Sequence, residues 1–168
     1  IKGACKLEPA AYEEIKVNPE VTKQAIVLNA VISVEVGLYA LFTESELTLL
    51  TALAAGFASY WLSLAMQLAL LYMIARRIPH PPPSPTIIQF FRTMSFANAP
   101  LVFLPMALVP VVATVYGLAL VGWLLGTFLT GIRITFGWTR LREPLVVTAI
   151  YFLVFLGTDL ALIFLFTD

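Results

Sequence analysis

The sequence has 168 residues, of which 60% are hydrophobic and only 12% are charged, and its formal net charge is zero. A soluble domain carries about 25% charged residues, and a chain of this length cannot bury so large an apolar fraction in a water-soluble core. The composition therefore excludes a soluble globular protein and predicts an all-α integral membrane protein. The basic residues form no patch mixed with aromatic residues, so nucleic acid is not an expected partner.

Residues 1–21 are expected to form a cytoplasmic or interfacial N-terminal segment, because they are rich in charge and contain two prolines. Within them, residues 10–17 predict a short interfacial helix with Tyr12 and Ile15 on one side. Cys5 is the sole cysteine, which excludes an internal disulfide and a multi-cysteine metal site. A lipid anchor and a free thiol both remain open at Cys5.

Residues 22–168 are expected to form a single transmembrane domain of five helices, since a spanning helix needs about 20 apolar residues. The predicted spans are residues 22–42, 47–75, 94–110, 111–132 and 145–166. The second and third spans are separated by the proline-dense stretch 78–85, which is too rich in proline for a helix and predicts an extended connector. Residues 86–96 then predict a second interfacial helix.

The division between the third and fourth spans rests on length and on prolines. No charged residue lies between Arg92 and Arg133. One straight helix of that length would measure about 60 Å, roughly twice the thickness of the hydrocarbon core. Pro100, Pro105 and Pro110 interrupt the segment, and Pro110 lies where a hairpin would turn.

The distribution of basic residues tests this five-span arrangement and predicts its orientation. In that arrangement every Lys and Arg lies on one side of the membrane. The basic residues that set the topology between the spans are Arg76, Arg77, Arg92, Arg133, Arg140 and Arg142, and Lys2, Lys6, Lys16 and Lys23 precede or begin the first span. By the positive-inside rule, the N-terminus is cytoplasmic and the C-terminus lies outside.

Two acids lie inside the predicted spans, and apart from Lys23 at the start of the first span no basic residue lies in the spans to pair with them. Glu35 and Asp159 are each about 12 Å below the outer boundary, at 1.5 Å of rise per residue. Intramembrane acids are by default functional candidates. Three alternatives remain open: an acid pair that shares a proton or binds a cation, protonated packing residues such as Glu35 bonded to Tyr39, or side chains that reach outer-leaflet water.

Gly122 and Gly126 form a G-x-x-x-G pattern on the fourth span, a spacing that allows close approach of helix backbones. Packing within the predicted hairpin is favoured over a seam between two copies. His80 is the sole histidine, and no nucleophile, phosphate-binding or metal-binding motif is present. The sequence therefore predicts no enzyme activity and no cofactor.

Three stretches resemble prokaryotic Yip-domain proteins: "LEPAAYEEIKVNPEVTKQA", "IIQFFRTMSFANAPLVF" and "GWTRLREPLVV". The second contains the family's aromatic-Ala-x-x-Pro entry into its third span, at Phe96, Ala97 and Pro100. The resemblance extends from about Leu7 to Phe166 and implies a five-span helical membrane protein. Eukaryotic relatives interact with Rab-type GTPases and carry a long cytoplasmic tail with an Asp-Leu-Tyr-Gly-Pro-like segment. This sequence lacks that segment, so GTPase binding is not carried over.

These observations favour a non-enzymatic scaffold or accessory subunit in a bacterial cytoplasmic membrane. Its expected partners are the lipid bilayer and either other integral membrane proteins or further copies of the chain. One alternative is a small transporter or a proton or cation pathway that uses Glu35 and Asp159. A second alternative is membrane shaping or trafficking, which would depend on the predicted helix at residues 10–17.

Overall fold

A computed structural model describes residues 8–43, 46, 48–109 and 113–166, except for the side chains of residue 107 and residues 155–166. Within these ranges the chain is helical and contains no strand, which confirms the expected all-α class. The elements are α2 (Pro9–Val17), α3 (Val21–Thr43), α4 (Leu49–Ala75), α5 (Ile87–Ala97), the 3-10 helix η1 (Ala99–Leu108), α6 (Ala113–Thr135) and α7 (Arg142–Phe166).

Four helical segments in the described ranges are long and apolar enough to cross a membrane, which indicates an integral membrane protein. They are Val21–Thr43, Leu49–Ala75, Ile87–Met106 and Ala113–Thr135. The third segment differs from the sequence prediction, because it joins the expected interfacial helix 86–96 to the expected span 94–110. Pro100 does not interrupt it, since this proline lies at the start of η1, where a missing N–H leaves no hydrogen bond unmade.

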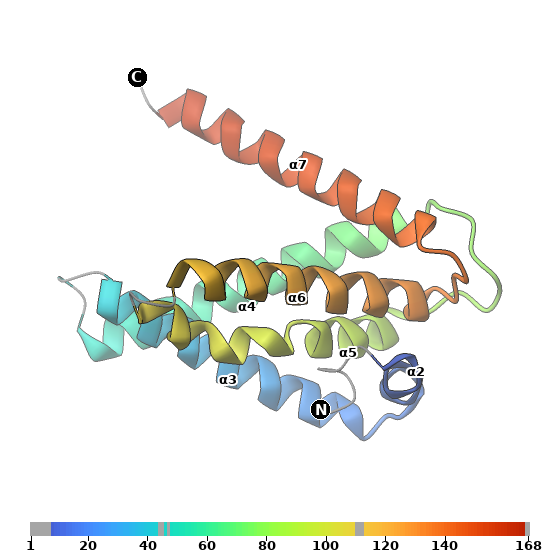
Figure 1. Ribbon diagram of the computed structural model, residues 1–168, viewed down its shortest axis with the longest axis horizontal. Coiled ribbons are helices and arrows are strands. Elements are labelled where there is room, and N and C mark those ends of the chain that lie inside the picture. Colours follow the sequence, from blue (N-terminus) through green and yellow to red (C-terminus); the bar gives the residue numbers. More distant parts are fainter. Residues whose placement is uncertain (1–7, 44–45, 47, 110–112, 167–168) are drawn as a thin grey trace.

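The helices alternate in direction along the long axis of the molecule (Figure 1). α3 leads away from the end that holds α2, α4 returns, α5 and η1 lead away again, and α6 returns before α7 departs. α3 packs against α4, α5 and η1, while α7 packs against α4 and α6. This order places the connection from α4 to α5 and the connection from α6 to α7 at the same end of the bundle.

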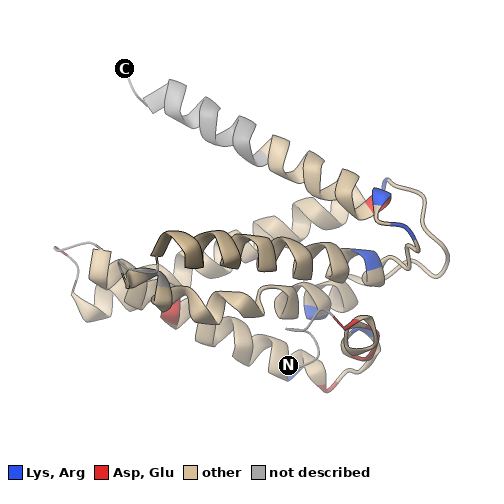
Figure 2. Ribbon diagram, viewed as in Figure 1, with Lys and Arg blue, Asp and Glu red and all other residues tan. Residues whose placement is uncertain are grey.

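That shared end carries the basic residues of the described chain (Figure 2). Arg76 and Arg77 follow α4, Arg133 lies in the last turn of α6, and Arg140 and Arg142 flank the start of α7. The clustering agrees with the one-sided distribution expected from the sequence. We refer to this end of the bundle as the basic end.

Aromatic packing holds the proline-rich connector at the basic end. The Phe136 ring stacks on Trp138 at 5.0 Å between centroids, and the His80 ring meets the Phe136 ring edge-on at 5.4 Å between centroids. The Trp138 indole N–H donates to the carbonyl oxygen of Pro79 at 2.8 Å, and the Tyr72 hydroxyl donates to that of Pro85 at 2.8 Å. The connector is therefore fixed against the bundle by two hydrogen bonds.

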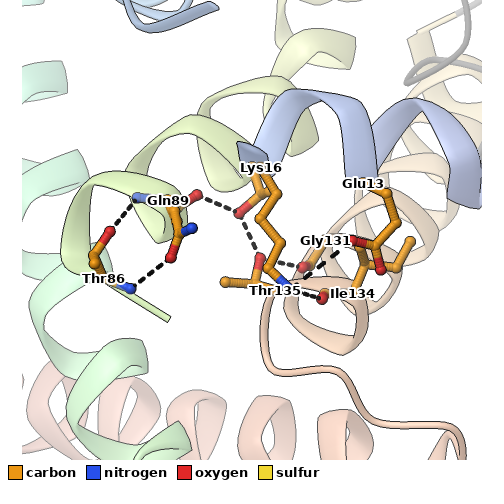
Figure 3. Close-up of polar contacts among 8 residues, drawn as sticks. Glu13, Lys16, Thr86, Gln89, Gly131, Ile134 and Thr135 are labelled. Atoms are coloured by element: carbon orange, nitrogen blue, oxygen red, sulfur yellow. Dashed lines mark hydrogen bonds and ion pairs between the residues drawn. The ribbon is translucent and has the colours of Figure 1, made fainter. Parts of the chain in front are cut away.

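α2 lies across the basic end and packs against α5 and α6, and it buries Tyr12 and Ile15, the two residues predicted to share one side of the helix. Figure 3 shows how Lys16 holds it there. The Lys16 ammonium donates to the carbonyl oxygen of Ile134 at 3.1 Å and lies 3.9 Å from the Glu13 carboxylate. A cation at the C-terminal end of α6 also interacts favourably with the helix dipole. The apolar side of α2 is thus used for packing within the protein.

Candidate functional site

A cluster of uncharged polar side chains joins three helices in the core of the bundle. The Asn29 amide of α3 donates to the Ser95 hydroxyl of α5 at 2.7 Å and to the carbonyl oxygen of Ala25 at 2.8 Å. The Tyr60 hydroxyl of α4 donates to the Asn29 carbonyl oxygen at 2.7 Å. Asn29 and Ser95 are both fully buried. We call these three residues, Asn29, Tyr60 and Ser95, the Asn29 cluster.

The Asn29 cluster is a packing device rather than a reactive site, because each amide hydrogen and the amide oxygen of Asn29 has a partner. The candidate residues predicted from the sequence were mainly charged ones and did not include this cluster. The available signal was an asparagine within an apolar run, since a buried amide in a membrane span needs hydrogen-bond partners on other helices.

A groove of about 510 Å³ lies between α4, η1, α6 and α7. We call it the α6 groove; its lining residues are Gln67, Asn98, Leu101, Val121, Leu124, Leu125, Phe128, Tyr151 and Phe152. Val121 and Phe152 are more than half exposed, so the groove opens to the outside of the bundle. Its open side is apolar, while Gln67 and Asn98 place polar groups on its wall.

Gly122 lies on the same helix as the α6 groove and faces open space. A Cβ atom built at Gly122 or at Gly117 meets no described atom within 4 Å. Packing of Gly122 within the hairpin, which the sequence favoured, therefore remains a prediction. Gly126 contributes its carbonyl oxygen to a hydrogen bond from the Thr130 hydroxyl at 2.8 Å. The outward face of α6 thus combines an open glycine with exposed Val115, Leu118 and Val121.

The glycines that bring two helices together lie elsewhere, on α3 and α4. A Cβ atom at Gly37 would lie 2.9 Å from the carbonyl oxygen of Ala52 and 2.9 Å from the Cα of Leu53. A Cβ atom at Gly56 would overlap the backbone of Gly37. No sequence pattern indicates this pair, because the two glycines lie on different helices.

A second groove, of about 500 Å³, lies between α3 and η1. We call it the α3 groove; its lining residues are Lys23, Gln24, Val27, Leu28, Val31, Ala99, Val102 and Phe103. Lys23 is the charged member of the lining and lies near the start of α3, at the basic end. The Phe103 wall is held by the Trp123 ring, stacked at 5.7 Å, and by the Tyr116 hydroxyl, which donates to the Phe103 carbonyl oxygen.

The six predicted topology-setting arginines occupy different environments. Arg76, Arg77, Arg140 and Arg142 are exposed, and Arg133 is half-buried. The Arg76 guanidinium lies over the Tyr72 ring, 5.6 Å from its centroid. Arg92 differs from the others, because only 7% of it is exposed. Its Nε and Nη1 atoms are buried and have no hydrogen-bond partner.

Glu35 is half-buried on α3, and Asp159 lies in α7 with its side chain outside the described residues. The predicted pairing of the two acids therefore remains a prediction. The described contacts give the Glu35 carboxylate no hydrogen bond to Tyr39 and no ion pair. Among the residues whose placement is described, no group of three or more His, Cys, Asp and Glu side chains could hold a metal ion. Cys5 also lies outside them.

Comparison with known proteins found no matching family model, no matching curated protein and no matching solved structure. The resemblance to Yip-domain proteins therefore remains a prediction from the three stretches quoted above. The function must be inferred from the two grooves, the exposed face of α6 and the charges that accompany them.

Proposed function

We propose that this chain is a five-span scaffold or accessory subunit that binds lipids and other membrane proteins, with a cytoplasmic N-terminus. The α6 groove is the observation that carries this proposal. Apolar side chains on its rim stay exposed even though the neighbouring helices pack closely. In a bilayer such a face is covered by lipid or by a partner helix, and an open glycine beside it favours a helix.

The alternating helix order and the basic end support the five-span topology. α7 has 25 residues, which is enough to cross the hydrocarbon core. The positive-inside rule favours a cytoplasmic basic end, and a bacterial cytoplasmic membrane is the setting that accompanies this proposal. The resemblance to Yip-domain proteins implies the same span number.

The proposal is tested by placing bulk on the exposed face of α6. Gly122→Leu should lower the recovery of co-purifying membrane proteins by about tenfold or more, since overpacking a helix contact costs about 1–3 kcal/mol. The thermal unfolding temperature of the isolated chain should stay unchanged, because a Cβ at Gly122 meets nothing within 4 Å. Recovery is measured by quantitative mass spectrometry after purification from the native membrane in mild detergent.

Ala58→Leu is the matched control, because Ala58 is a small, exposed residue on α4. It should leave the recovered proteins unchanged. If the Gly122→Leu chain recovers the same proteins in the same amounts, the face of α6 is not the partner surface. If a second copy of this chain is the protein recovered, the partner is a homo-oligomer.

An ion pathway is the second candidate, and the unpaired Glu35 carboxylate within an apolar helix favours it. A pathway that uses this acid predicts a proton or cation flux into liposomes that contain the protein. Glu35→Gln should abolish the flux, because the amide cannot carry the charge or exchange the proton. Absence of flux with the unsubstituted protein would exclude this function.

Membrane shaping by the N-terminal helix receives no support from the fold. Its apolar residues Tyr12 and Ile15 are buried against the bundle, and Lys16 holds the helix to α6. An amphipathic helix shapes a bilayer by burying its apolar face in lipid. In α2 that face is already occupied.

A further inference from the structure

Arg92 carries a buried positive charge with no ion-pair partner among the described residues. Arg92 is 7% exposed, and its Nε and Nη1 atoms lack hydrogen-bond partners. The ion pair found in the described residues is the one between Lys16 and Glu13, so no described carboxylate neutralises Arg92. A charge removed from water without a partner costs several kcal/mol. A negative group from another molecule would offset that cost.

The register of α5 places Arg92 toward α3. Ser95 faces α3, because its hydroxyl accepts a hydrogen bond from Asn29. Arg92 precedes Ser95 by three residues, about one helical turn, and side chains at this spacing share one side of a helix. Arg92 therefore lies on the side of α5 that faces α3, one turn closer to the basic end than the Asn29–Ser95 contact.

Lys23 lies close to the same level of the bundle. α3 and α5 both lead away from the basic end (Figure 1). The hydrogen bond between Asn29 and Ser95 marks a common level on the two helices. At 1.5 Å of rise per residue, Lys23 is about 9 Å and Arg92 about 4.5 Å below that level. The two positive charges thus differ by about 5 Å in height along the bundle axis. Lys23 lines the α3 groove, and Arg92 lies near the same level without being one of its lining residues.

The α3 groove continues from these charges as an apolar channel. From Lys23 to Val31 the groove follows α3 for about 12 Å, and Ala99, Val102 and Phe103 form its opposite wall. The groove thus has positive charge near the basic end and apolar walls toward the bilayer centre, which suits one chemical class of ligand. That class has a negative headgroup joined to an acyl chain.

We propose that the α3 groove binds an anionic phospholipid, with its phosphate at Arg92 and Lys23 and one acyl chain along Val27, Val31 and Phe103. This inference rests on the lipid-binding part of the proposed function and specifies its site and its ligand. It does not involve the α6 groove. If Gly122→Leu leaves the recovered proteins unchanged, the lipid site in the α3 groove is therefore not contradicted. Likewise, a negative lipid result would not contradict a partner at the α6 groove.

The test measures lipid retention and lipid-dependent stability in the purified chain. In native mass spectrometry, the unsubstituted protein should retain phosphatidylglycerol at least about tenfold more than phosphatidylcholine, and Lys23→Gln and Arg92→Met should each remove that preference. Phosphatidylglycerol should also raise the thermal unfolding temperature of the unsubstituted protein. Inorganic phosphate should not raise it, because the acyl chain supplies the apolar contact.

Arg92→Met has a second signature that a merely structural residue would not show. Without lipid it should unfold at the same temperature as the unsubstituted protein or higher, because it removes an unpaired buried charge. With phosphatidylglycerol the order should reverse. Val27→Trp fills the groove from an exposed position and should lower lipid retention without altering the fold.

Arg77→Gln is the matched control, since Arg77 is an exposed arginine at the same end of the bundle and lies outside the groove lining. It should retain the lipid preference. If Arg77→Gln loses the preference for phosphatidylglycerol to the same extent, net charge explains the effect and the proposed site is overturned. Retention of phosphatidylglycerol by both Lys23→Gln and Val27→Trp would also overturn it. If inorganic phosphate raises the unfolding temperature as much as phosphatidylglycerol does, the ligand is a free anion and the lipid proposal is overturned.

Discussion

Gly56→Val is expected to separate α3 from α4 and to lower the free energy of unfolding by about 3 kcal/mol or more. Even the first side-chain carbon at Gly56 would overlap the Cα and backbone nitrogen of Gly37, and it would lie 3.1 Å from the carbonyl oxygen of Ser33. Backbone atoms cannot rotate away as a flexible side chain can. The two helices must therefore move apart along their whole contact.

Moving α3 away from α4 would also break contacts that depend on their distance. Tyr60 follows Gly56 by one turn of α4, and its hydroxyl reaches Asn29 on α3 at 2.7 Å. The expected result is a lower thermal unfolding temperature in detergent, together with loss of the native near-ultraviolet circular dichroism. Both are measured on the purified chain.

Gly117→Val is the matched control for this prediction, because it introduces the same side chain into another helix at an open position. It should leave the unfolding temperature close to that of the unsubstituted protein, since valine is a slightly better helix former than glycine. If both substitutions destabilise the protein equally, helix propensity explains the loss and the close approach of Gly37 and Gly56 does not.

The contrast between these glycines shows what the sequence could and could not reveal. Apolar length and charge position predicted the helices well, because the thickness of the hydrocarbon core and the cost of buried charge act on single segments. Which glycine meets another helix depends on how each helix is rotated in the bundle. The G-x-x-x-G pattern on α6 was visible in the sequence, whereas the pair formed by Gly37 and Gly56 requires two helices in register.

The two grooves were beyond prediction for the same reason. The walls of the α3 groove come from α3 and η1, which are not consecutive in the chain, and the sequence predicted a separate interfacial helix at residues 86–96. Arg92 was predicted only as a topology-setting charge at the membrane boundary. Its burial follows from the continuation of α5 into η1, which brings the first turns of α5 into the bundle.

Asn29→Ala is expected to lower the free energy of unfolding by about 2–3 kcal/mol, because it removes two contacts between helices at once. The Tyr60 hydroxyl loses its acceptor, and the Ser95 hydroxyl loses the amide that donates to it. The substitution also leaves a cavity among α3, α4 and α5. Thermal unfolding in detergent measures the loss. Ser33→Ala is the control, since the buried Ser33 hydroxyl donates only within α3, to the carbonyl oxygen of Ala30.

The same substitution links the core of the bundle to the lipid site. The Asn29–Ser95 hydrogen bond fixes the rotation of α5 against α3, and this rotation directs Arg92 toward the α3 groove. Asn29→Ala should therefore also weaken phosphatidylglycerol retention, although Asn29 is not part of the groove lining. Combining Asn29→Leu with Tyr60→Phe and Ser95→Ala should restore part of the lost stability, since the polar groups of the Asn29 cluster are then removed together. The recovery is incomplete because the buried Asn98 side chain loses its hydrogen bond to Tyr60. If the triple variant is no more stable than Asn29→Ala, packing volume rather than hydrogen bonding holds these three helices together.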